Sequence, residues 1–401
     1  MKEKIHTIDL FAGCGGLMDG FEATGFYDTL ACVEWEKAPC ENAKQRLKNK
    51  WGYADADNKV LQFDIQRTNE LFNGWNDKKF GEHKGLDSLV KNKKVDLIIG
   101  GPPCQAYSVA GRIRDEKGMK EDYRNFLFES FIKVVKKYKP KALVFENVPG
   151  LLSAKPKDRL IVLDIVKAFD KAGYVVIDPK KALIDFTEYG IPQNRKRLII
   201  LGIRKDVFGE KAENMLVKFY AELANQKEKK QTVKQAICDL PELLPNKDGK
   251  IDCYTKSKVP NHIARYQNKR DKKIFNMLAK DIETGENKFV KISELKKIYK
   301  KATGNDSAVH KYNVLRLDKP SNTIPAHLYK DGLRHIHPDP KQSRTITVRE
   351  AARLQTFPDD YVFIGSMADQ FKMIGNAVPP KFSKKLANVI YNVLFAKGTI
   401  C

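Results

Sequence analysis

Cysteine is scarce in this 401-residue sequence: seven copies occur, an odd number, and no two form a Cys-x-x-Cys pair. A disulfide framework needs an even, paired set, and a structural zinc site needs closely spaced ligands. The sequence therefore indicates neither disulfides nor a metal site. It predicts a protein of a reducing, cytoplasmic compartment.

Long apolar runs are absent as well. No stretch reaches the ~18 consecutive apolar residues that a membrane-spanning helix needs. The apolar start of the chain, residues 5–11, is interrupted by polar side chains and leads into glycines rather than a cleavage site. We therefore expect a first β-strand here, with no signal peptide and no membrane partner.

Acidic residues are in deficit. The chain has 73 Lys and Arg against 50 Asp and Glu, which gives a formal net charge of +23. The basic excess extends through the middle of the chain, residues 204–318, so it is not confined to a detachable tail. A charge of this size and sign favours a polyanionic partner such as a nucleic acid.

Short apolar segments alternate with helical patterns in the first half of the chain. This alternation is typical of an α/β fold with a doubly wound, mostly parallel sheet. The predicted helices cover residues 37–48, 125–138 and 160–172. The predicted strands are residues 5–11, 30–34, 60–65, 95–100, 142–147, 174–177 and 197–203.

The composition changes after residue 204, where Lys-rich and Asn-rich stretches broken by prolines replace the alternation. We expect an α/β domain at residues 1–203 and a smaller irregular domain at residues 204–341. A C-terminal segment, residues 342–401, should return to the first domain. It contains a predicted helix at residues 381–395, where apolar side chains recur at helical spacing.

Residues that follow the first three predicted strands suit a nucleoside. The glycines of residues 13–16 allow a backbone to approach a small molecule closely. Glu34 ends the second strand, where a carboxylate accepts ribose hydroxyls, and the indole of Trp35 can stack on an adenine. Asp64 could accept from the adenine amino group. Met18 replaces the third glycine of a dinucleotide-binding motif, which argues against a dinucleotide-dependent oxidoreductase.

A cysteine follows one of the buried strands. Two glycines and two prolines, residues 100–103, constrain the backbone before Cys104, at the sheet edge where open α/β folds bind ligands. A lone cysteine in a turn is more often a small buried apolar residue. Glu146 ends a neighbouring strand, and Arg195 and Arg197 should point to one side at the two-residue period. Together these groups favour a reactive thiol.

Six segments of the chain, in order, resemble the motifs of the DNA (cytosine-5) methyltransferases, and their bacterial restriction–modification members most of all. The resemblance runs from residue 8 to about residue 380 and leaves the middle segment unmatched. A Pro-Cys pair alone is common, whereas six motifs in the family's order are very hard to obtain by chance. The matching segments are residues 9–16, 101–105, 146–148, 193–197, 344–355 and 375–380.

The resemblance implies methyl transfer from S-adenosylmethionine to carbon 5 of a cytosine flipped out of a specific duplex DNA sequence. The Cys104 thiolate would add at C6, and Glu146 would carry or share a proton at N3. Two arginines would favour the thiolate and hold the base, and Asn147 would brace the Cys104 loop. No residue is implied as the base that removes the C5 proton. The implied catalytic residues are Cys104, Glu146, Arg195, Arg197 and Asn147.

The resemblance also implies the cofactor, S-adenosylmethionine, which leaves as S-adenosylhomocysteine, and it implies no metal. Arg334, His335 and His337 could suggest metal ligands, but without further ligand spacing a structural or phosphate-facing role is favoured. By motif position, the implied cofactor-binding residues are Phe11, Gly13, Gly15, Gly16, Glu34, Trp35, Asp64, Ile65, Leu127, Asn376 and Val378.

By the same resemblance, residues 204–341 form the target-recognition domain and the loop at 105–124 closes over DNA. The cluster at residues 265–270 mixes phosphate and base-edge donors, although such clusters are more often solvated. We expect double-stranded DNA as the partner and a monomeric protein in the bacterial cytoplasm or nucleoid. A companion restriction endonuclease would act on the same site without stable contact.

Two alternatives stay open. A related branch of the family acts on tRNA, so a tRNA cytosine is the first alternative substrate. A non-catalytic nucleic-acid binder is the second, and it predicts a damaged active site, whereas the cysteine, the glutamate and both arginines are present. The Pro-Cys-Gln and Glu-Asn-Val motifs, with a middle segment of over a hundred residues, favour duplex DNA.

Overall fold

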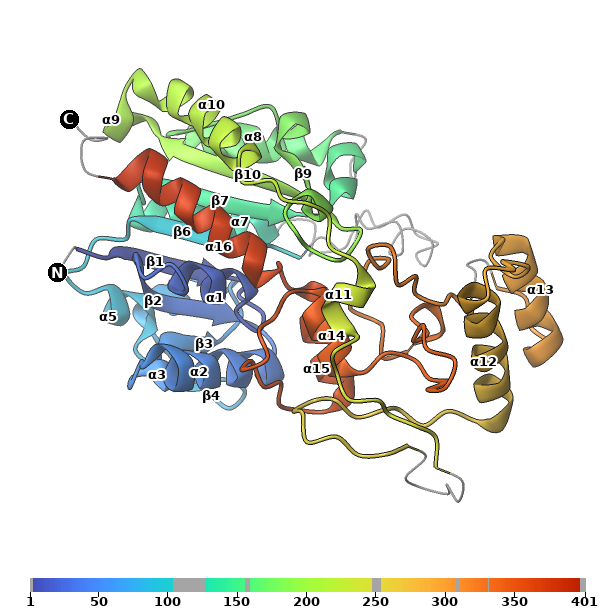
Figure 1. Cartoon of the computed structure of the whole chain (residues 1–401). Helices are drawn as coiled ribbons and strands as arrows, with labels where there is room; N and C mark the ends of the chain where they lie inside the picture. Colours follow the sequence, from blue (N-terminus) through green and yellow to red (C-terminus); the bar gives the residue numbers. More distant parts are fainter. Residues whose placement is uncertain are drawn as a thin grey trace. The chain divides into compact units, whose positions relative to one another are not determined.

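The computed structural model describes residues 3–103, 127–155, 159–246, 254–307, 311–330 and 332–396. The chain forms two compact units (Figure 1). Unit 1 comprises residues 1–189, 196–228 and 377–401, and unit 2 comprises residues 190–195 and 229–376. No helix of the described residues is long and apolar enough to cross a membrane.

Unit 1 is built on an eight-stranded sheet with the order β3-β2-β1-β6-β7-β10-β8, in which β9 also pairs with β10. Within this sheet, β3, β2, β1, β6 and β7 are parallel to one another, whereas β10 runs antiparallel to β7, β8 and β9. The predicted α/β class with a mostly parallel sheet is confirmed. The strands are β1 (Ile5–Leu10), β2 (Tyr27–Glu34), β3 (Val60–Gln62), β6 (Leu97–Gly100), β7 (Ala142–Asn147), β8 (Tyr174–Val176), β9 (Leu183–Asp185) and β10 (Lys196–Arg204).

Helices cover the sheet because its central strands are apolar on both sides. All residues of β6 and β7 are buried, as expected for parallel strands. Phe145 of β7 packs edge-on against Phe131 and Phe169, which belong to two helices of this layer. The helices of unit 1 include α1 (Gly16–Glu22), α2 (Lys37–Trp51), α7 (Leu127–Tyr138), α8 (Ile161–Lys171), α10 (Lys211–Ala224) and α16 (Pro380–Ile390).

Helices α1 and α16 lie side by side, although they are far apart in the sequence (Figure 1). Gly20 makes this approach possible, since a Cβ there would collide with Ser383. The C-terminal helix therefore packs on the first helix of the same unit.

A small hairpin was not predicted. Strands β4 (Trp75–Asp77) and β5 (Gly81–His83) form a separate two-stranded antiparallel sheet, flanked by α4 (Thr68–Asn73) and α5 (Gly85–Val90). Three-residue strands are too short for a pattern of alternation to be recognised.

Unit 2 is irregular, as expected for a segment rich in turn residues. Its helices are α11 (Val233–Ile237), α12 (Lys269–Glu283), α13 (Ile292–Thr303), α14 (Val348–Leu354) and α15 (Met367–Asn376). An apolar cluster joins α12 and α13 to the segment around residues 312–336; its buried members are Phe275, Leu278, Ala279, Leu295, Tyr312, Val314 and Ile336.

The unit boundaries differ from the predicted domain boundaries in two places. Residues 204–228 belong to unit 1 because α10 packs against β10 and α16, and because Glu228 pairs with Lys381 (2.7 Å) and Lys385 (2.6 Å). Residues 342–376 belong to unit 2, where α14 packs against α11 and α15. Only the segment from residue 377 onward returns to unit 1.

Candidate active site

The turn after β1 has an unusual backbone. Phe11, Gly13 and Gly15 have φ values of 58°, 55° and 83°. Such a φ is rare for a bulky residue such as phenylalanine, and it persists only where the surrounding structure enforces it. A Cβ at Gly16 would collide with the carbonyl oxygen of Val378, whereas a Cβ at Gly13 would meet no atom within 4 Å. Protein atoms therefore pack directly against Gly16, whereas the space beside Gly13 is free of them.

Glu34 is held at the end of β2 by two backbone groups. The N–H of Gly13 donates to its Oε2 (2.9 Å) and the N–H of Glu36 donates to its Oε1 (2.8 Å). Burial raises the pKa of Glu34, while these two backbone hydrogen bonds oppose the rise. Each carboxylate oxygen can accept a second hydrogen bond. The carboxylate thus suits the ribose hydroxyls predicted for it.

Trp35 and Asp64 follow two adjacent parallel strands, β2 and β3, so they lie at the same edge of the sheet. The side chain of Trp35 is 46% exposed. Asp64 is half-buried and its Oδ1 accepts from the N–H of Gln66 (3.0 Å), while the neighbouring Ile65 is buried. An exposed indole, a half-buried carboxylate and an apolar side chain fit the adenosyl part of S-adenosylmethionine.

Asp9 was not singled out by the sequence analysis. Its carboxyl is buried in β1, directly before the glycine turn. Burial raises the pKa of Asp9 well above its usual range, and the charge of Glu34 adds to the rise, while the backbone of Met18 opposes it. An acidic residue near the end of the first predicted strand, just before the glycines of residues 13–16, was the signal that could have identified it.

The second group of predicted residues lies after β6 and β7, which are parallel neighbours. Cys104 and the predicted closing loop at 105–124 lie outside the described residues. Pro102, just before the cysteine, is described, and its carbonyl oxygen accepts from Asn147 Nδ2 (3.2 Å). Asn147 thus contacts the backbone two residues before Cys104.

Glu146 of β7 faces both a glycine and an arginine. A Cβ at Gly101 would lie 2.5 Å from Glu146 Oε2, so a side chain there would push the carboxyl group out of its present position. Arg197 Nε lies 3.0 Å from Glu146 Oε1, and the two side chains are 13% and 12% exposed. Because Ile199 is the register partner of Glu146, Arg197 lies on the same face of the sheet two residues away. Arg197 therefore neutralises the charge of Glu146.

Burial lowers the pKa of Arg197, and the charge of Glu146 opposes the decrease. A guanidinium remains protonated at neutral pH even so. The pair thus consists of one carboxylate and one permanent cation at the carboxyl end of β7.

Arg195 has different neighbours from Arg197. It precedes β10, belongs to unit 2 and is 2% exposed. Its Nη2 donates to the carbonyl oxygen of Gly375 (3.0 Å) and its Nη1 to that of Ile324 (3.4 Å). Gln193 accepts from the N–H of Ile324 (2.9 Å). Within unit 2, the predicted arginine thus holds two chain segments together through backbone carbonyls.

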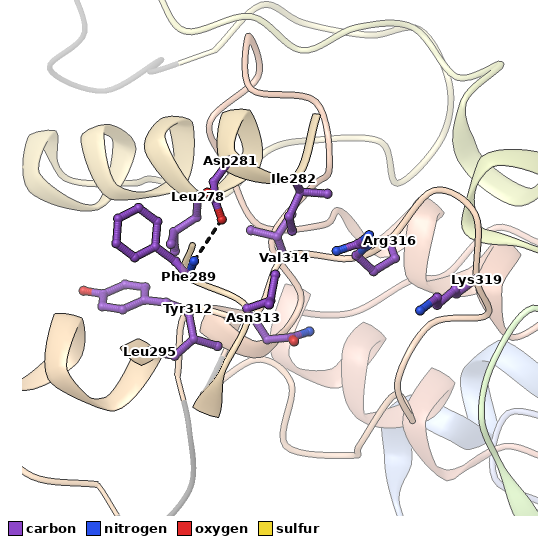
Figure 2. A pocket seen from close by; sticks show the side chains of 11 residues that line it. Leu278, Asp281, Ile282, Phe289, Leu295, Tyr312, Asn313, Val314, Arg316 and Lys319 are labelled. Atoms are coloured by element: carbon purple, nitrogen blue, oxygen red, sulfur yellow. Dashed lines mark hydrogen bonds between the residues drawn. The ribbon is translucent and has the colours of Figure 1, made fainter. Parts of the chain in front are cut away.

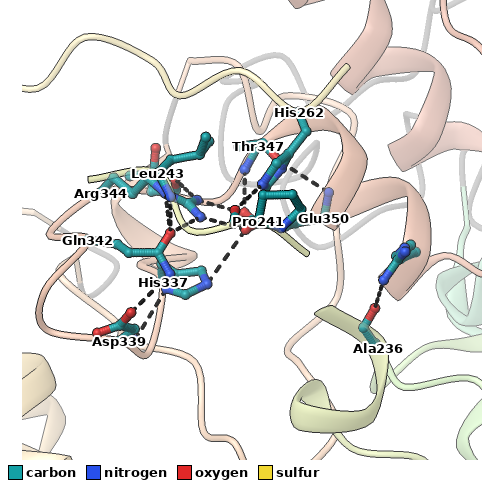
Figure 3. Close-up of polar contacts among 12 residues, drawn as sticks. Ala236, Pro241, Leu243, His262, His337, Asp339, Gln342, Arg344, Thr347 and Glu350 are labelled. Carbon is teal, nitrogen blue, oxygen red and sulfur yellow. Dashed lines mark hydrogen bonds and ion pairs between the residues drawn. The ribbon is translucent and has the colours of Figure 1, made fainter. Parts of the chain in front are cut away.

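Unit 2 contains a buried polar network around Glu350, in the first turn of α14 (Figure 3). Arg344 donates to both carboxylate oxygens (2.6 and 2.7 Å), and the N–H of Thr347 donates to Oε2 (2.7 Å). His337 Nε2 lies 3.5 Å from Glu350 Oε1. His262 contacts the hydroxyl of Thr347 (3.0 Å). The network ties together segments that are almost ninety residues apart.

The charges in this network are mutually dependent. Burial alone would raise the pKa of Glu350, but Arg344 and His337 outweigh it and lower the pKa to about 2. Burial lowers the pKa of His337 to about 4, against the influence of Glu350. At neutral pH, Glu350 is therefore charged and His337 is neutral.

The cluster at residues 265–270 is largely used for structure. Arg265 donates to the carbonyl oxygens of Leu328 (3.3 Å) and Tyr329 (3.1 Å). Asn268 caps α12, with its Oδ1 accepting from the N–H of Asp271 (2.8 Å). Tyr266 and Lys269 are exposed.

A cavity of about 180 Å³ lies beside α12 and α13 in unit 2 (Figure 2). Asp281, one of the lining residues, accepts from the N–H groups of Lys288 (2.8 Å) and Phe289 (3.0 Å). Apolar side chains such as Leu278 and Val314 line it, with Arg316 and Lys319 toward the other end.

Comparison with known proteins gives a consistent result. The family model described as C-5 cytosine-specific DNA methylase matches residues 5–392. The type II methyltransferase M.Bpa9945I of Bacillus paralicheniformis is 33% identical, over 96% of this chain and 98% of its own length. The type II methyltransferase M.DdeI of Desulfomicrobium norvegicum is 30% identical, over 96% of this chain and 88% of its own length.

Solved structures support the fold. A prophage-encoded E. coli protein described as a DNA modification methyltransferase aligns with a TM-score of 0.60 at 23% identity, over 98% of this chain and 99% of that chain. The S. pombe Dnmt2 methyltransferase aligns with a TM-score of 0.55 at 15% identity, over 98% of this chain and 100% of that chain.

Proposed function

The chain belongs to the C-5 cytosine-specific DNA methylase family, and on this premise we propose that it methylates carbon 5 of a cytosine within a specific duplex DNA sequence. The observation that carries the proposal is the arrangement at the ends of β6 and β7. There Glu146 lies against the backbone of Gly101 and pairs with Arg197, while Asn147 holds the carbonyl of Pro102. Cys104 follows Pro102 by two residues in the sequence.

Cys104 is the proposed nucleophile. Its thiolate forms a bond to C6 of the cytosine, and the electrons of the C5–C6 double bond become available at C5. When bound, S-adenosylmethionine would supply the electrophilic methyl group for C5 and leave as S-adenosylhomocysteine. Transfer of the C5 proton to a base, for which water suffices, then re-forms the double bond and releases the Cys104 thiolate. Because these carbons lie inside the base stack, the cytosine must be flipped out, which costs a few kcal/mol.

Glu146 is the proposed acid. Glu146 would take up a proton from solvent as the base binds and share it with N3, where negative charge accumulates as the thiolate adds. Arg197 neutralises the carboxylate before the base binds, which lowers the cost of bringing an electron-rich base beside it. Asn147 is proposed to keep the Pro-Cys turn at a fixed distance from Glu146, through its hydrogen bond to Pro102.

The cofactor site is proposed at the ends of β1, β2 and β3. Glu34 would accept from the ribose hydroxyls, Trp35 would stack on the adenine, and Asp64 would accept from its amino group. The open side of Gly13 leaves room for the methionine part. The other residues proposed to line the cofactor are Phe11, Gly15, Gly16, Ile65, Leu127, Asn376 and Val378.

Unit 2 is proposed to recognise the target sequence, and the net charge of +23 supports a DNA partner. Since the similar proteins are named as type II methyltransferases, we propose that methylation protects DNA from a companion restriction endonuclease. That nuclease would act on the same site without stable contact. The protein would work as a monomer in the bacterial cytoplasm.

A methyl-transfer assay that offers duplex DNA and tRNA side by side tests this function. Labelled methyl groups should enter duplex DNA, and label in tRNA alone would overturn the proposed substrate. Bisulfite sequencing of DNA from cells that express the protein would then identify the target sequence and the modified base together. Methylation at a carbon or base other than C5 of cytosine would contradict the proposed chemistry.

A further inference from the structure

The β4–β5 hairpin, residues 75–83, packs its aromatic residues against the residues that follow β2 and β3. Trp75 stacks on the buried Phe63 with ring centroids 3.9 Å apart. Its Nε1 donates to the carbonyl oxygen of Phe80 (3.3 Å). Trp75 itself is buried. The hairpin is therefore anchored to unit 1 through its first strand, and its turn is held against that anchor.

Asp77 sets the conformation of the hairpin turn. Its Oδ1 accepts from the N–H groups of Lys79 (2.9 Å) and Phe80 (2.7 Å), as in turns that an aspartate side chain caps. Its Oδ2 accepts from Arg67 Nη1 (2.6 Å), and Arg67 also binds Glu70 of α4. Asp77 thus fixes the backbone of the turn that carries Lys79 and Phe80.

Phe80 reaches Trp35. The two rings meet edge-on with centroids 5.7 Å apart, and Phe80 makes a similar contact with Phe63 at 5.3 Å. Lys79 Nζ lies 4.0 Å from the centroid of the Trp35 ring. The half-exposed indole therefore receives two contacts from consecutive residues of the hairpin turn.

We propose that the hairpin pre-positions the indole of Trp35 for stacking on the adenine of S-adenosylmethionine, with Phe80 as the positioning residue. This inference rests on the proposed cofactor role of Trp35. An exposed indole loses rotational freedom when a base stacks on it, and a ring that already holds it in place reduces this loss. Edge-to-face aromatic pairs add specific stabilisation to such an arrangement. Phe80 thereby strengthens cofactor binding without touching the reacting atoms.

The test compares cofactor affinity in Phe80→Ala and Trp35→Ala, measured by calorimetric titration with S-adenosylhomocysteine. Phe80→Ala should raise the Kd about threefold to tenfold, the range expected for losing one aromatic pair. It should raise the KM for S-adenosylmethionine by a similar factor and leave kcat unchanged. Phe80→Tyr keeps the ring and should restore the wild-type Kd. Asn76→Ala, an exposed change on the same hairpin, is the matched control and should have no effect.

A double-mutant cycle separates positioning from direct contact. If Phe80 acts through the indole, Phe80→Ala should change the Kd less than about twofold when Trp35 is already alanine. An equal effect in both backgrounds would overturn the inference. An unchanged Kd in Phe80→Ala, with a weakened Trp35→Ala, would also overturn it and leave the proposed cofactor site intact. No effect of Trp35→Ala would instead refute the proposed cofactor role of Trp35.

Phe80→Leu covers the case in which the alanine variant unfolds. It keeps apolar volume against Phe63 but removes the aromatic edge, so its Kd should still rise. A wild-type Kd in a folded Phe80→Leu protein would contradict the inference, because simple filling of space would then suffice.

Discussion

Each unit contains a buried arginine–glutamate pair, and the two pairs differ in how the glutamate is held. In unit 2, Glu350 and Arg344 are each 1% exposed and joined by two hydrogen bonds, with a third from the backbone of Thr347. In unit 1, Arg197 approaches Glu146 through Nε at 3.0 Å, and the side chains are 13% and 12% exposed.

The difference indicates different uses of the same chemistry. A carboxylate enclosed by protein donors at the start of a helix stabilises the segments around it. A carboxylate at the end of a parallel strand, beside a glycine that allows close approach, lies where α/β folds bind ligands. Burial of a charged pair is therefore not sufficient to propose a catalytic role, and the proposal for Glu146 also depends on its place at the end of a parallel strand.

The same substitution in both pairs gives the sharpest contrast. Glu146→Gln should lower kcat by about 10² to 10⁴-fold, because the amide cannot share a proton with N3. The protein should remain folded, which circular dichroism and a methyl-transfer assay on one preparation can check. Near-normal turnover would remove Glu146 from the proposed mechanism.

Glu350→Gln should show the reverse pattern. Removing one charge of a fully buried pair leaves Arg344 without its counter-charge, so the free energy of unfolding should fall by about 3–5 kcal/mol. Urea denaturation measures this loss. We expect kcat of the folded fraction to change far less than in Glu146→Gln. If both variants lose activity but keep their stability, or if both lose stability but keep their activity, the distinction between the two pairs fails.

The network in unit 2 should also make stability depend on pH. His337 has a pKa of about 4 in the folded protein, below the ~6.5 of an unfolded chain. Between these values the unfolded chain binds the extra proton, so stability should fall as the pH decreases from about 6.5 to about 4. The loss attributable to His337 is at most about 3 kcal/mol. Denaturation curves across this range should flatten in His337→Gln.

Glu350 contributes to the pH dependence of stability over a lower pH range than His337. Its folded pKa of about 2 lies below the usual value of 4.5, so its stabilisation is complete above about pH 4.5 and is lost as the pH falls toward about 2. A wild-type protein whose free energy of unfolding is constant from pH 7 to 4 would contradict the lowered pKa of His337.

An exposed pair should matter least. Asp306 accepts from Lys300 Nζ (3.0 Å), and the two side chains are 81% and 63% exposed. Solvent screens such a pair, so Asp306→Asn should lower the free energy of unfolding by less than about 1 kcal/mol. A loss as large as that of Glu350→Gln would show that burial is not what separates strong pairs from weak ones.

The central sheet was largely predictable from the sequence. Strand β7 has the predicted bounds, and β1, β6 and β10 differ by one or two residues at an end. Buried parallel strands read as continuous apolar runs, which makes them easy to recognise. The reversed direction of β10 was not predictable, since an apolar run carries no information about its partner's direction.

The site was predictable only in part. The strand-end positions of Glu34, Trp35 and Asp64 follow from the alternation of strands and helices. The different neighbours of Arg195 and Arg197 did not follow, because β10 begins at Lys196 and the two-residue period does not extend before it. The contact of Phe80 with Trp35 depends on a turn set by one aspartate, which no periodic pattern reveals.

Covalent trapping tests the central claim most directly. A duplex carrying the methylated site with 5-fluorocytosine in place of the target cytosine should be incubated with protein and S-adenosylmethionine. The fluorine at C5 cannot leave as a proton does, so elimination is blocked and the bond between Cys104 and C6 should persist through denaturation. Mass spectrometry should locate the adduct on Cys104, and Cys104→Ser should form none. An active enzyme that forms no adduct, or one bonded elsewhere, would contradict the account.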